Sequence, residues 1–274
     1  MSSVILKQKV KEILPRELLD LIRPRSFHAF CVGAEKTGTT SVAEIFQGTH
    51  RVGHDSRWDD TTHHMLLLYR NEIAREAFCR YLVKRDKQLW LELESSCLMG
   101  YCAPHLITIF PRAKFVLTIR DCFSWLKSII NHQKTHKRVN PGLDRWHCVE
   151  WEPQNFEYSP HDEPLGKYGL FPLDCFLNHW TKSITRVTES IPSEQLLIIK
   201  TKDIGNSVEY LAKFLGLSDN ECSSFERKHS NQQVVDHKIL EQIDEQYVAD
   251  RCWELCGDQM QKFFPDFVES EKST

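Results

Sequence analysis

The sequence predicts an α/β fold, a single domain in which a central parallel β-sheet is flanked by helices. Short apolar segments typical of buried strands alternate along the chain with segments of helical periodicity, which indicates a parallel sheet covered on both faces. One of the strand segments runs directly into a turn rich in glycine and threonine that opens a helix. Residues 1–274 contain no internal repeat and no low-complexity linker, so one domain is expected.

Four segments are predicted to be strands because they are short, apolar and mostly rich in β-branched or aromatic residues. They are residues 28–33, 89–94, 114–120 and 195–200. Helices are predicted where apolar residues recur every three or four positions, over residues 41–47, 62–86, 98–110, 123–133 and 207–217. Pro111 is expected to stop the third of these helices, and Gly216 is expected to end the last.

Three segments lie outside this alternation. Residues 1–26 are predicted to form an amphipathic helical extension, since lysines interrupt the apolar runs at its start. Residues 135–172 carry five prolines and little periodicity, so an irregular insertion is expected there, placed as a lid over the carboxyl edge of the sheet. Residues 234–266 are predicted to form a C-terminal helical segment with a break near Gly257.

Composition argues against several classes of protein. Lys plus Arg number 35 and Asp plus Glu 38, a formal net charge of -3, whereas a protein that binds duplex nucleic acid is usually basic. The sequence contains no run of about 18 apolar residues, so no membrane span is predicted. The N-terminus lacks the apolar core of a signal peptide, so a cytoplasmic protein is expected. The ten cysteines form no CxxC pair and no zinc-type cluster with histidine; mostly buried free thiols and no bound metal are expected.

The turn after the first strand is the most informative feature of the chain. It runs from Gly33 to Thr40 and opens a helix, so several backbone N–H groups and the positive end of the helix dipole point at one place. It is not a Walker A loop, in which the lysine directly follows the second glycine, because here Lys36 precedes Gly38. The turn still predicts a phosphate or sulfate site. The residues predicted to form it are Lys36, Thr37, Gly38, Thr39, Thr40 and Ser41.

A second anion site is predicted at the end of the buried strand 114–120. Arg120 leaves this strand at the carboxyl edge of the sheet, where ligands bind in open α/β folds. Ser128 follows eight residues later on the next helix. A guanidinium and a hydroxyl that converge on one anion suit a phosphate monoester.

Together the two motifs resemble those of the sulfotransferases that use 3′-phosphoadenylyl sulfate (PAPS). In that family a KxGTT-type loop after the first strand holds the 5′-phosphosulfate, and a strand ending in Arg, with Ser eight residues later, holds the 3′-phosphate. Both patterns occur here in the same order, and the resemblance covers roughly residues 27–231. It implies a P-loop-NTPase-like architecture, PAPS as donor and adenosine 3′,5′-bisphosphate (PAP) as product. The RKG segment of the cytosolic members is absent, and Arg227 and Lys228 are assigned its role.

The resemblance also implies a general base that takes the proton of the acceptor. In heparan-type members the base is a glutamate in an EKS-like motif, and the matching residue here is Glu94, followed by Ser95 in place of the lysine. Cytosolic members use a histidine. His54, beside the predicted phosphate site, and His132, four residues beyond Ser128, are therefore alternative bases.

Acidic and aromatic residues are predicted to face the acceptor, because carboxylates and indole rings suit a flat cation. These residues are Glu92, Trp58, Asp59 and Trp151. The expected acceptor is a small molecule such as an alkaloid, sulfated on a hydroxyl, amine or guanidinium nitrogen. In this respect the chain is similar to natural-product sulfotransferases of cyanobacterial toxin pathways.

Two other functional classes stay open. A P-loop-like nucleotide-binding protein or small-molecule kinase should have a Walker A lysine and a strand-end aspartate for Mg²⁺. That lysine is missing, and Asp121 is the nearest carboxylate. The other class is a nucleotide-binding scaffold without catalysis, against which Lys36 and the base candidates argue.

Overall fold

The computed structural model describes residues 16–136, 141–218 and 235–272. In this part of the chain five parallel strands form one sheet in the order β2-β3-β1-β4-β5, which confirms the predicted α/β fold. The central strand β1 pairs with both β3 and β4. The strands are β1 (Ala29–Cys31), β2 (Val52–His54), β3 (Leu93–Ser95), β4 (Lys114–Ile119) and β5 (Leu196–Lys200).

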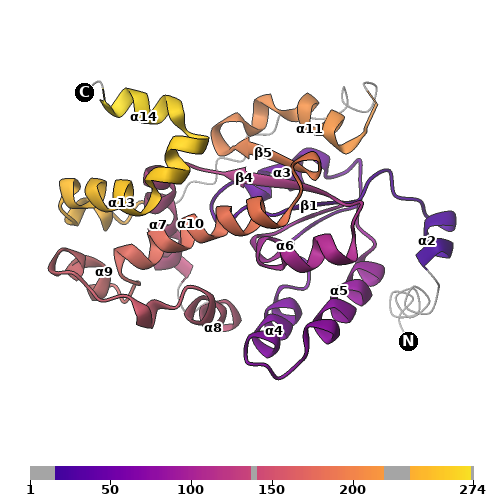
Figure 1. The fold of residues 1–274 in the computed structure, drawn as a ribbon, viewed down its shortest axis with the longest axis horizontal. Helices are drawn as coiled ribbons and strands as arrows, with labels where there is room; N and C mark the ends of the chain where they lie inside the picture. Colours follow the sequence, from indigo (N-terminus) through magenta and orange to yellow (C-terminus); the bar gives the residue numbers. More distant parts are fainter. Residues whose placement is uncertain (1–15, 137–140, 219–234, 273–274) are drawn as a thin grey trace.

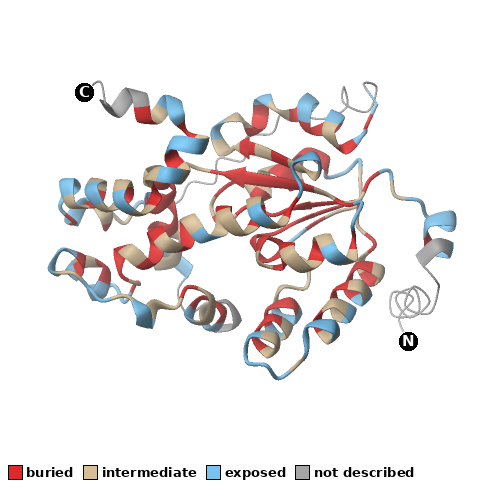
Figure 2. Ribbon diagram, viewed as in Figure 1, coloured by how far each residue is buried: buried red, intermediate tan, exposed pale blue. Residues whose placement is uncertain are grey.

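Helices bury the sheet from both sides. In β4, Phe115 and Leu117 pack into one hydrophobic cluster and Val116 into another, because successive side chains of a strand point to opposite faces. The first cluster includes residues of α6 (Cys97–Ile109), α7 (Cys122–His136), α10 (Leu173–Ser190) and α13 (Glu245–Phe263), and the second includes those of α3 (Thr39–Phe46) and α11 (Val208–Leu215). Figure 1 shows α11 and α10 on opposite sides of the sheet, and Figure 2 shows the buried strands between them.

The stop signals at two predicted helix ends act as expected. Helix α6 ends at Ile109, two residues before Pro111. Helix α11 ends at Leu215, and Gly216 caps it with a φ of 87°, a conformation that glycine adopts without strain. At its other end α6 is capped by Ser96, whose hydroxyl accepts from the N–H of Leu98 at 3.2 Å.

The segment before β3 differs from the prediction. The single helix expected over residues 62–86 is two helices, α4 (Trp58–Tyr69) and α5 (Arg75–Leu89), separated by a turn in which Asn71 has a φ of 56°. Helix α5 continues to Leu89, and Trp90 ends it with a φ of 53°. The strand predicted over residues 89–94 was therefore wrong in its first half, because α5 extends to Leu89 and β3 begins only at Leu93.

A strand and a long helix next to the sheet were not predicted from the sequence. Strand β2 has three residues with Gly53 in the middle, too short and too polar for a strand signal. Helix α10, in contrast, does carry a helical signal in the sequence, since its buried residues recur at helical spacing. Those on this pattern are Leu173, Phe176, Leu177, Trp180, Ile184 and Val187.

The segment 135–172 is more regular than expected. Outside residues 137–140 it contains α8 (Pro141–Glu150), α9 (Glu163–Lys167) and two 3₁₀ turns, η1 (Pro153–Asn155) and η2 (Pro160–Asp162). Four of the five prolines that suggested an irregular insertion lie in the first turns of these helices, and the fifth, Pro172, directly precedes α10. A missing N–H costs nothing there, because the first N–H groups of a helix have no partner within it.

The remaining elements lie near the two ends of the described chain and around β5. Helix α13 passes through Gly257 without the expected break. The elements are α2 (Arg16–Ile22), η3 (Ser193–Gln195), η4 (Thr201–Asn206), η5 (Leu240–Gln242) and α14 (Pro265–Lys272). No helix among the described residues is both long and apolar enough to span a membrane. The cysteines that the structure describes are free thiols, and most are buried.

Candidate functional site

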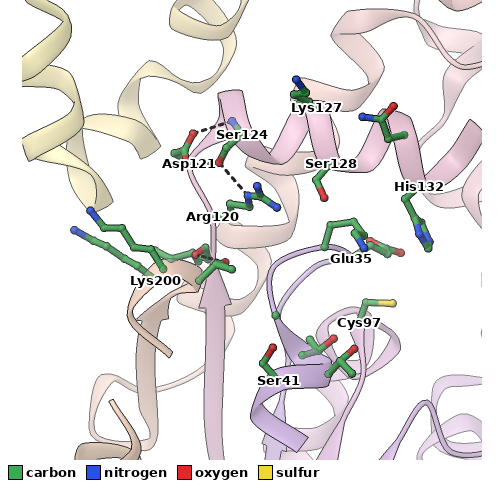
Figure 3. Close-up of a pocket in the computed structure, with 18 of the residues that line it drawn as sticks. Glu35, Ser41, Cys97, Arg120, Asp121, Ser124, Lys127, Ser128, His132 and Lys200 are labelled. Carbon is green, nitrogen blue, oxygen red and sulfur yellow. Dashed lines mark hydrogen bonds between the residues drawn. The ribbon is translucent and has the colours of Figure 1, made fainter. Parts of the chain in front are cut away.

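A cavity of about 1200 Å³ opens at the carboxyl edge of the sheet. It lies where β1, β4 and β5 end and is bordered by α7 and the C-terminal helices (Figure 3). Ligands of open α/β sheets bind at this edge. The volume exceeds the ~300–1,000 Å³ of a usual small-ligand pocket, so it can hold a nucleotide together with a second molecule.

Most residues that the sequence singled out come together in this cavity. Thr37 is an exception, because its hydroxyl points into the loop and bonds the carbonyl of Ala34 at 2.7 Å and the hydroxyl of Thr118 at 2.8 Å. The predicted residues that line the cavity are Lys36, Gly38, Thr39, Thr40, Ser41, His54, Trp58, Arg120, Ser128 and His132.

The loop between β1 and α3, residues 33–38, passes unusually close to its neighbours; we call it the cradle. A Cβ on Gly33 would lie 1.9 Å from the hydroxyl oxygen of Thr118, and a Cβ on Gly38 would lie 2.4 Å from Ile204. Gly38 also has a φ of 107°, which disfavours any other residue. The two glycines are therefore required for the cradle to present the N-terminus of α3 to the cavity.

Two cations of the site repel each other. Burial, and after it the charge of Arg120, lowers the pKa of Lys36. Burial also lowers the pKa of Arg120, although the charge of Asp121 opposes this. In the part of the chain that the structure describes, neither side chain forms an ion pair with a carboxylate. An anion bound between them would relieve both the repulsion and the desolvation of the two charges.

Helix α7 fixes the direction of Arg120. Nε of Arg120 donates to the hydroxyl of Ser124 at 2.9 Å, and that hydroxyl donates to the carboxylate of Asp121. The same carboxylate accepts from the N–H of Ser124 at 2.8 Å, which secures the first turn of the helix. Figure 3 shows the guanidinium directed toward Ser128, as the sequence motif led us to expect.

Several cavity residues were not identified from the sequence. Lys200 ends β5 at the same edge as Arg120, so the rule that strand ends gather at one edge could have found it. The aromatic residues on the C-terminal helices gave no such signal, because only the tertiary fold brings them there. The residues missed on this side are Lys200, Thr201, Lys202, Phe264 and Phe267.

A histidine and a carboxylate lie beside the cradle, at the end of β2. Nε2 of His54 lies 3.2 Å from the hydroxyl of Thr40, and Nδ1 lies 3.4 Å from the carboxylate of Asp55. Asp55 also accepts a hydrogen bond of 2.6 Å from the hydroxyl of Ser96. Burial raises the pKa of Asp55. The ring of His54 is about one-third exposed and is oriented by a partner on each side.

The structure argues against Glu94 as the base. Glu94 is 5% exposed, and its carboxylate is bound by the guanidinium of Arg85 from α5. Burial lowers the pKa of Arg85, but the charge and hydrogen bonds of Glu94 outweigh this and raise it. The alternation of β3 places Glu94 on the face covered by α5 and not at the strand end. Its lone pairs are therefore not presented to an acceptor in the cavity.

Three of the four residues predicted to bind the acceptor lie elsewhere. Glu92 precedes β3 at the opposite edge of the sheet, where it accepts from the N–H groups of Ser26 and Arg51, each at 2.9 Å. Trp151 is 1% exposed and stacks on a histidine of α10 inside the core. Asp59 lies exposed in the first turn of α4, outside the cavity. Only Trp58 lines the cavity.

Arg227 and Lys228 lie outside the described residues. Among the residues that the structure does describe, no cluster of three or more His, Cys, Asp or Glu side chains is arranged to bind a metal.

His132 faces the cavity from α7, and its charge state is perturbed. Burial, followed by the charge of Lys36, lowers its pKa from 6.5 to about 4. Burial likewise lowers the pKa of His179, in α10. Both imidazoles are therefore less easily protonated in the folded chain than in the unfolded chain.

This difference predicts that acid begins to destabilise the protein near pH 6.5, above the range in which carboxylates titrate. Between pH 6.5 and pH 4 the unfolded chain binds more protons at His132 than the folded chain, so the free energy of unfolding should fall as the pH is lowered. The full shift corresponds to at most about 3 kcal/mol. Urea unfolding at several pH values should show a smaller pH slope for His132→Asn than for the wild type. Equal slopes would contradict the assignment.

Comparison with known proteins identifies the family of the chain. Residues 28–234 match the model of the sulfotransferase domain. No curated protein matches the chain significantly. Among solved structures, the sulfotransferase from Alicyclobacillus acidocaldarius superposes with a TM-score of 0.47 and 17% identity, covering 84% of this chain and 95% of that one. The sulfotransferase domain of the Synechococcus PCC 7002 olefin synthase superposes with a TM-score of 0.39 and 14% identity, covering 79% and 83%.

The assignment rests on the domain match, which spans both anion motifs and the strands between them. At this level of similarity, the two solved structures identify neither the sulfuryl donor nor the acceptor of this chain. The chain belongs to the sulfotransferase family.

Proposed function

We propose that the chain transfers the sulfuryl group of PAPS to a small polar acceptor. The observation that carries the proposal is the pair of Lys36 and Arg120, two cations on one cavity, neither of which forms an ion pair with a carboxylate of the described residues. PAPS is anionic at both its 5′ and 3′ ends, and two basic points on one cavity suit such a ligand. The cradle that Gly33 and Gly38 keep open adds backbone donors at one of these points.

Each end of the donor is assigned to its own residues. Lys36 and the start of α3 hold the phosphosulfate, while Arg120 and Ser128 hold the 3′-phosphate. Bound PAPS supplies an activated sulfuryl group. Lys36 stabilises the negative charge that develops on the leaving oxygen, whereas Arg120 holds a phosphate whose charge does not change.

His54 is assigned as the general base. Nδ1 lies 3.4 Å from the carboxylate of Asp55. Nε2 lies 3.2 Å from the hydroxyl of Thr40, on the side of the cradle, and is the nitrogen assigned to take the proton of the acceptor. Glu94 is not available for this role because Arg85 binds its carboxylate. His132 remains a second candidate, and its lowered pKa makes it the weaker base.

The end of the cavity around His54 suits a cationic acceptor. Two carboxylates and an indole ring line it, those of Asp55, Asp144 and Trp58. Carboxylates and an indole face bind organic cations by ion pairing and cation–π contact. A hydroxyl, amine or guanidinium nitrogen of a small alkaloid-like molecule is the proposed nucleophile.

Nucleotide preference tests the proposal. In calorimetry PAP should bind without Mg²⁺, and about 10–100-fold more tightly than adenosine 5′-monophosphate, since a hydrogen-bonded charge contributes about 1.5–3 kcal/mol. A chelator should leave PAP binding and sulfuryl transfer unchanged. Tight binding of ATP that depends on Mg²⁺, with no preference for the 3′-phosphate, would instead identify a kinase-like protein.

A further inference from the structure

Glu35 is a buried carboxylate in the cradle, 8% exposed. Its Oε1 accepts from the hydroxyl of Tyr101 at 3.3 Å and from Nε2 of His147 at 3.2 Å. Its Oε2 lies 3.5 Å from Nε2 of His179. Its backbone carbonyl accepts from the indole N–H of Trp125 at 2.8 Å. Four helices, α6, α7, α8 and α10, thus each place one side chain within 3.5 Å of an oxygen of Glu35.

The carboxylate of Glu35 is ionised at neutral pH. Burial alone would raise its pKa, but the hydrogen bonds and charges of His147 and His179 outweigh burial and hold the pKa well below its usual range. Removing the partners of a buried carboxylate destabilises the fold, because the charge is then left buried and unpaired. Glu35 is therefore fixed to these helices and does not move freely into the cavity.

The next residue, Lys36, has a φ of 64°. A residue with a side chain is strained in this left-handed region and persists there only where its surroundings impose the conformation. Both neighbouring carbonyls are tied down, that of Glu35 by Trp125 and that of Thr37 by the hydroxyl of Thr201 at 2.6 Å. The side chain of Glu35 adds a third anchor immediately before the strained residue.

We propose that Glu35 is a positioning residue, whose attachment to α6, α8 and α10 holds Lys36 in the left-handed conformation that presents its ammonium group to the sulfuryl donor. The role given to Lys36 rests on the proposed function. The attachment itself does not, because it is formed by side chains of this chain alone.

The first test is Glu35→Gln, which keeps the shape of the side chain and removes its charge. We expect kcat to fall about 10²-fold, as a displacement of about 1 Å can cost that much, while the Kd of PAP changes less than threefold. The matched control is Asp162→Asn, a buried carboxylate of the insertion that binds the N–H groups of Ser159 and Leu173 away from the cavity. It should lower the melting temperature and leave kcat unchanged.

The second test observes Lys36 directly and needs no nucleotide. Lysines are labelled with ¹³C-methyl groups, and the signal of Lys36 is assigned by its loss in Lys36→Arg. In the wild type this signal should titrate below the usual lysine range, because burial and Arg120 lower the pKa. In Glu35→Gln the released side chain should titrate closer to that range. If Glu35→Gln does not fold, His147→Asn, which removes one of the anchors, should shift the signal in the same direction.

The outcomes separate the inference from the proposed function. An unchanged Lys36 titration in a folded Glu35 variant overturns the inference, and so does an equal loss of kcat in Asp162→Asn. A wild-type protein that does not bind PAP overturns the proposed function, while the Lys36 titration still decides whether Glu35 positions the lysine.

Discussion

Replacing Lys36 with alanine should lower turnover by about 10²–10³-fold while changing the Kd of PAP only slightly, since this is the usual cost of one lost donor to developing charge. Arg120→Ala should do the reverse. It removes a charged contact to a phosphate that does not react, so the Kd of PAP should rise about 10–100-fold, the equivalent of about 1.5–3 kcal/mol. Ser128→Ala should raise the Kd in the same sense by a smaller factor.

Calorimetry with PAP and single-turnover rates at saturating PAPS measure these two effects separately. Lys84→Ala is a suitable control, since Lys84 is a lysine of α5 that lies outside the cavity. The assignment fails if Lys36, Arg120 and Ser128 variants all weaken PAP binding equally and leave the single-turnover rate untouched.

His54→Ala and Glu94→Gln should have effects of different kinds. Loss of a positioned base costs about 10²–10⁴-fold in rate, so the His54 variant should be folded, bind PAP and turn over slowly. Glu94→Gln leaves the guanidinium of Arg85 buried without its partner, and removal of one member of a buried ion pair costs about 3–5 kcal/mol. Its main effect should be on the free energy of unfolding.

Urea unfolding and single-turnover rates, both measured across pH, distinguish these outcomes. In addition, Asp55→Asn should lower the rate less than His54→Ala, because it disturbs the orientation of the imidazole and leaves the proton acceptor in place. A stable Glu94→Gln that has lost activity, beside a His54→Ala of near wild-type rate, would return the base to Glu94. An acceptor whose amine is neutral at pH 7 needs less help from a base, so the pH–rate profile must accompany either result.

The half of the cavity that we propose holds the donor could be located from the sequence because its information is local. The cradle is one run of consecutive residues, and Arg120 and Ser128 are placed by one strand and the helix that follows it. The rule that parallel strands end at one edge then brings the two motifs together. Neither step requires knowledge of which distant residues pack against which.

The base could not be chosen in this way, because Glu94 and His54 differ in their surroundings and not in their motifs. The alternation of β3 gives the face on which Glu94 lies, but whether that face opens to solvent or to Arg85 depends on where α5 packs. His54 lies on β2, whose three residues carry no strand signal of their own and are defined by pairing with β3. Tertiary packing therefore places Glu94, the base that the sequence favoured, in a buried ion pair with Arg85.

The sequence by itself determined the α/β fold, the turn that forms the cradle and the placement of Arg120 and Ser128 on one cavity, since each follows from short-range spacing and from strand direction. Only the tertiary structure decided which carboxylates are charged partners of the core and which residues face the acceptor. The side-chain partners of Glu35, for example, include Tyr101 and His147, 66 and 112 residues away along the chain. The physical reason is that desolvation and ion pairing depend on every group within a few ångströms, and chain folding brings those groups together from unrelated segments.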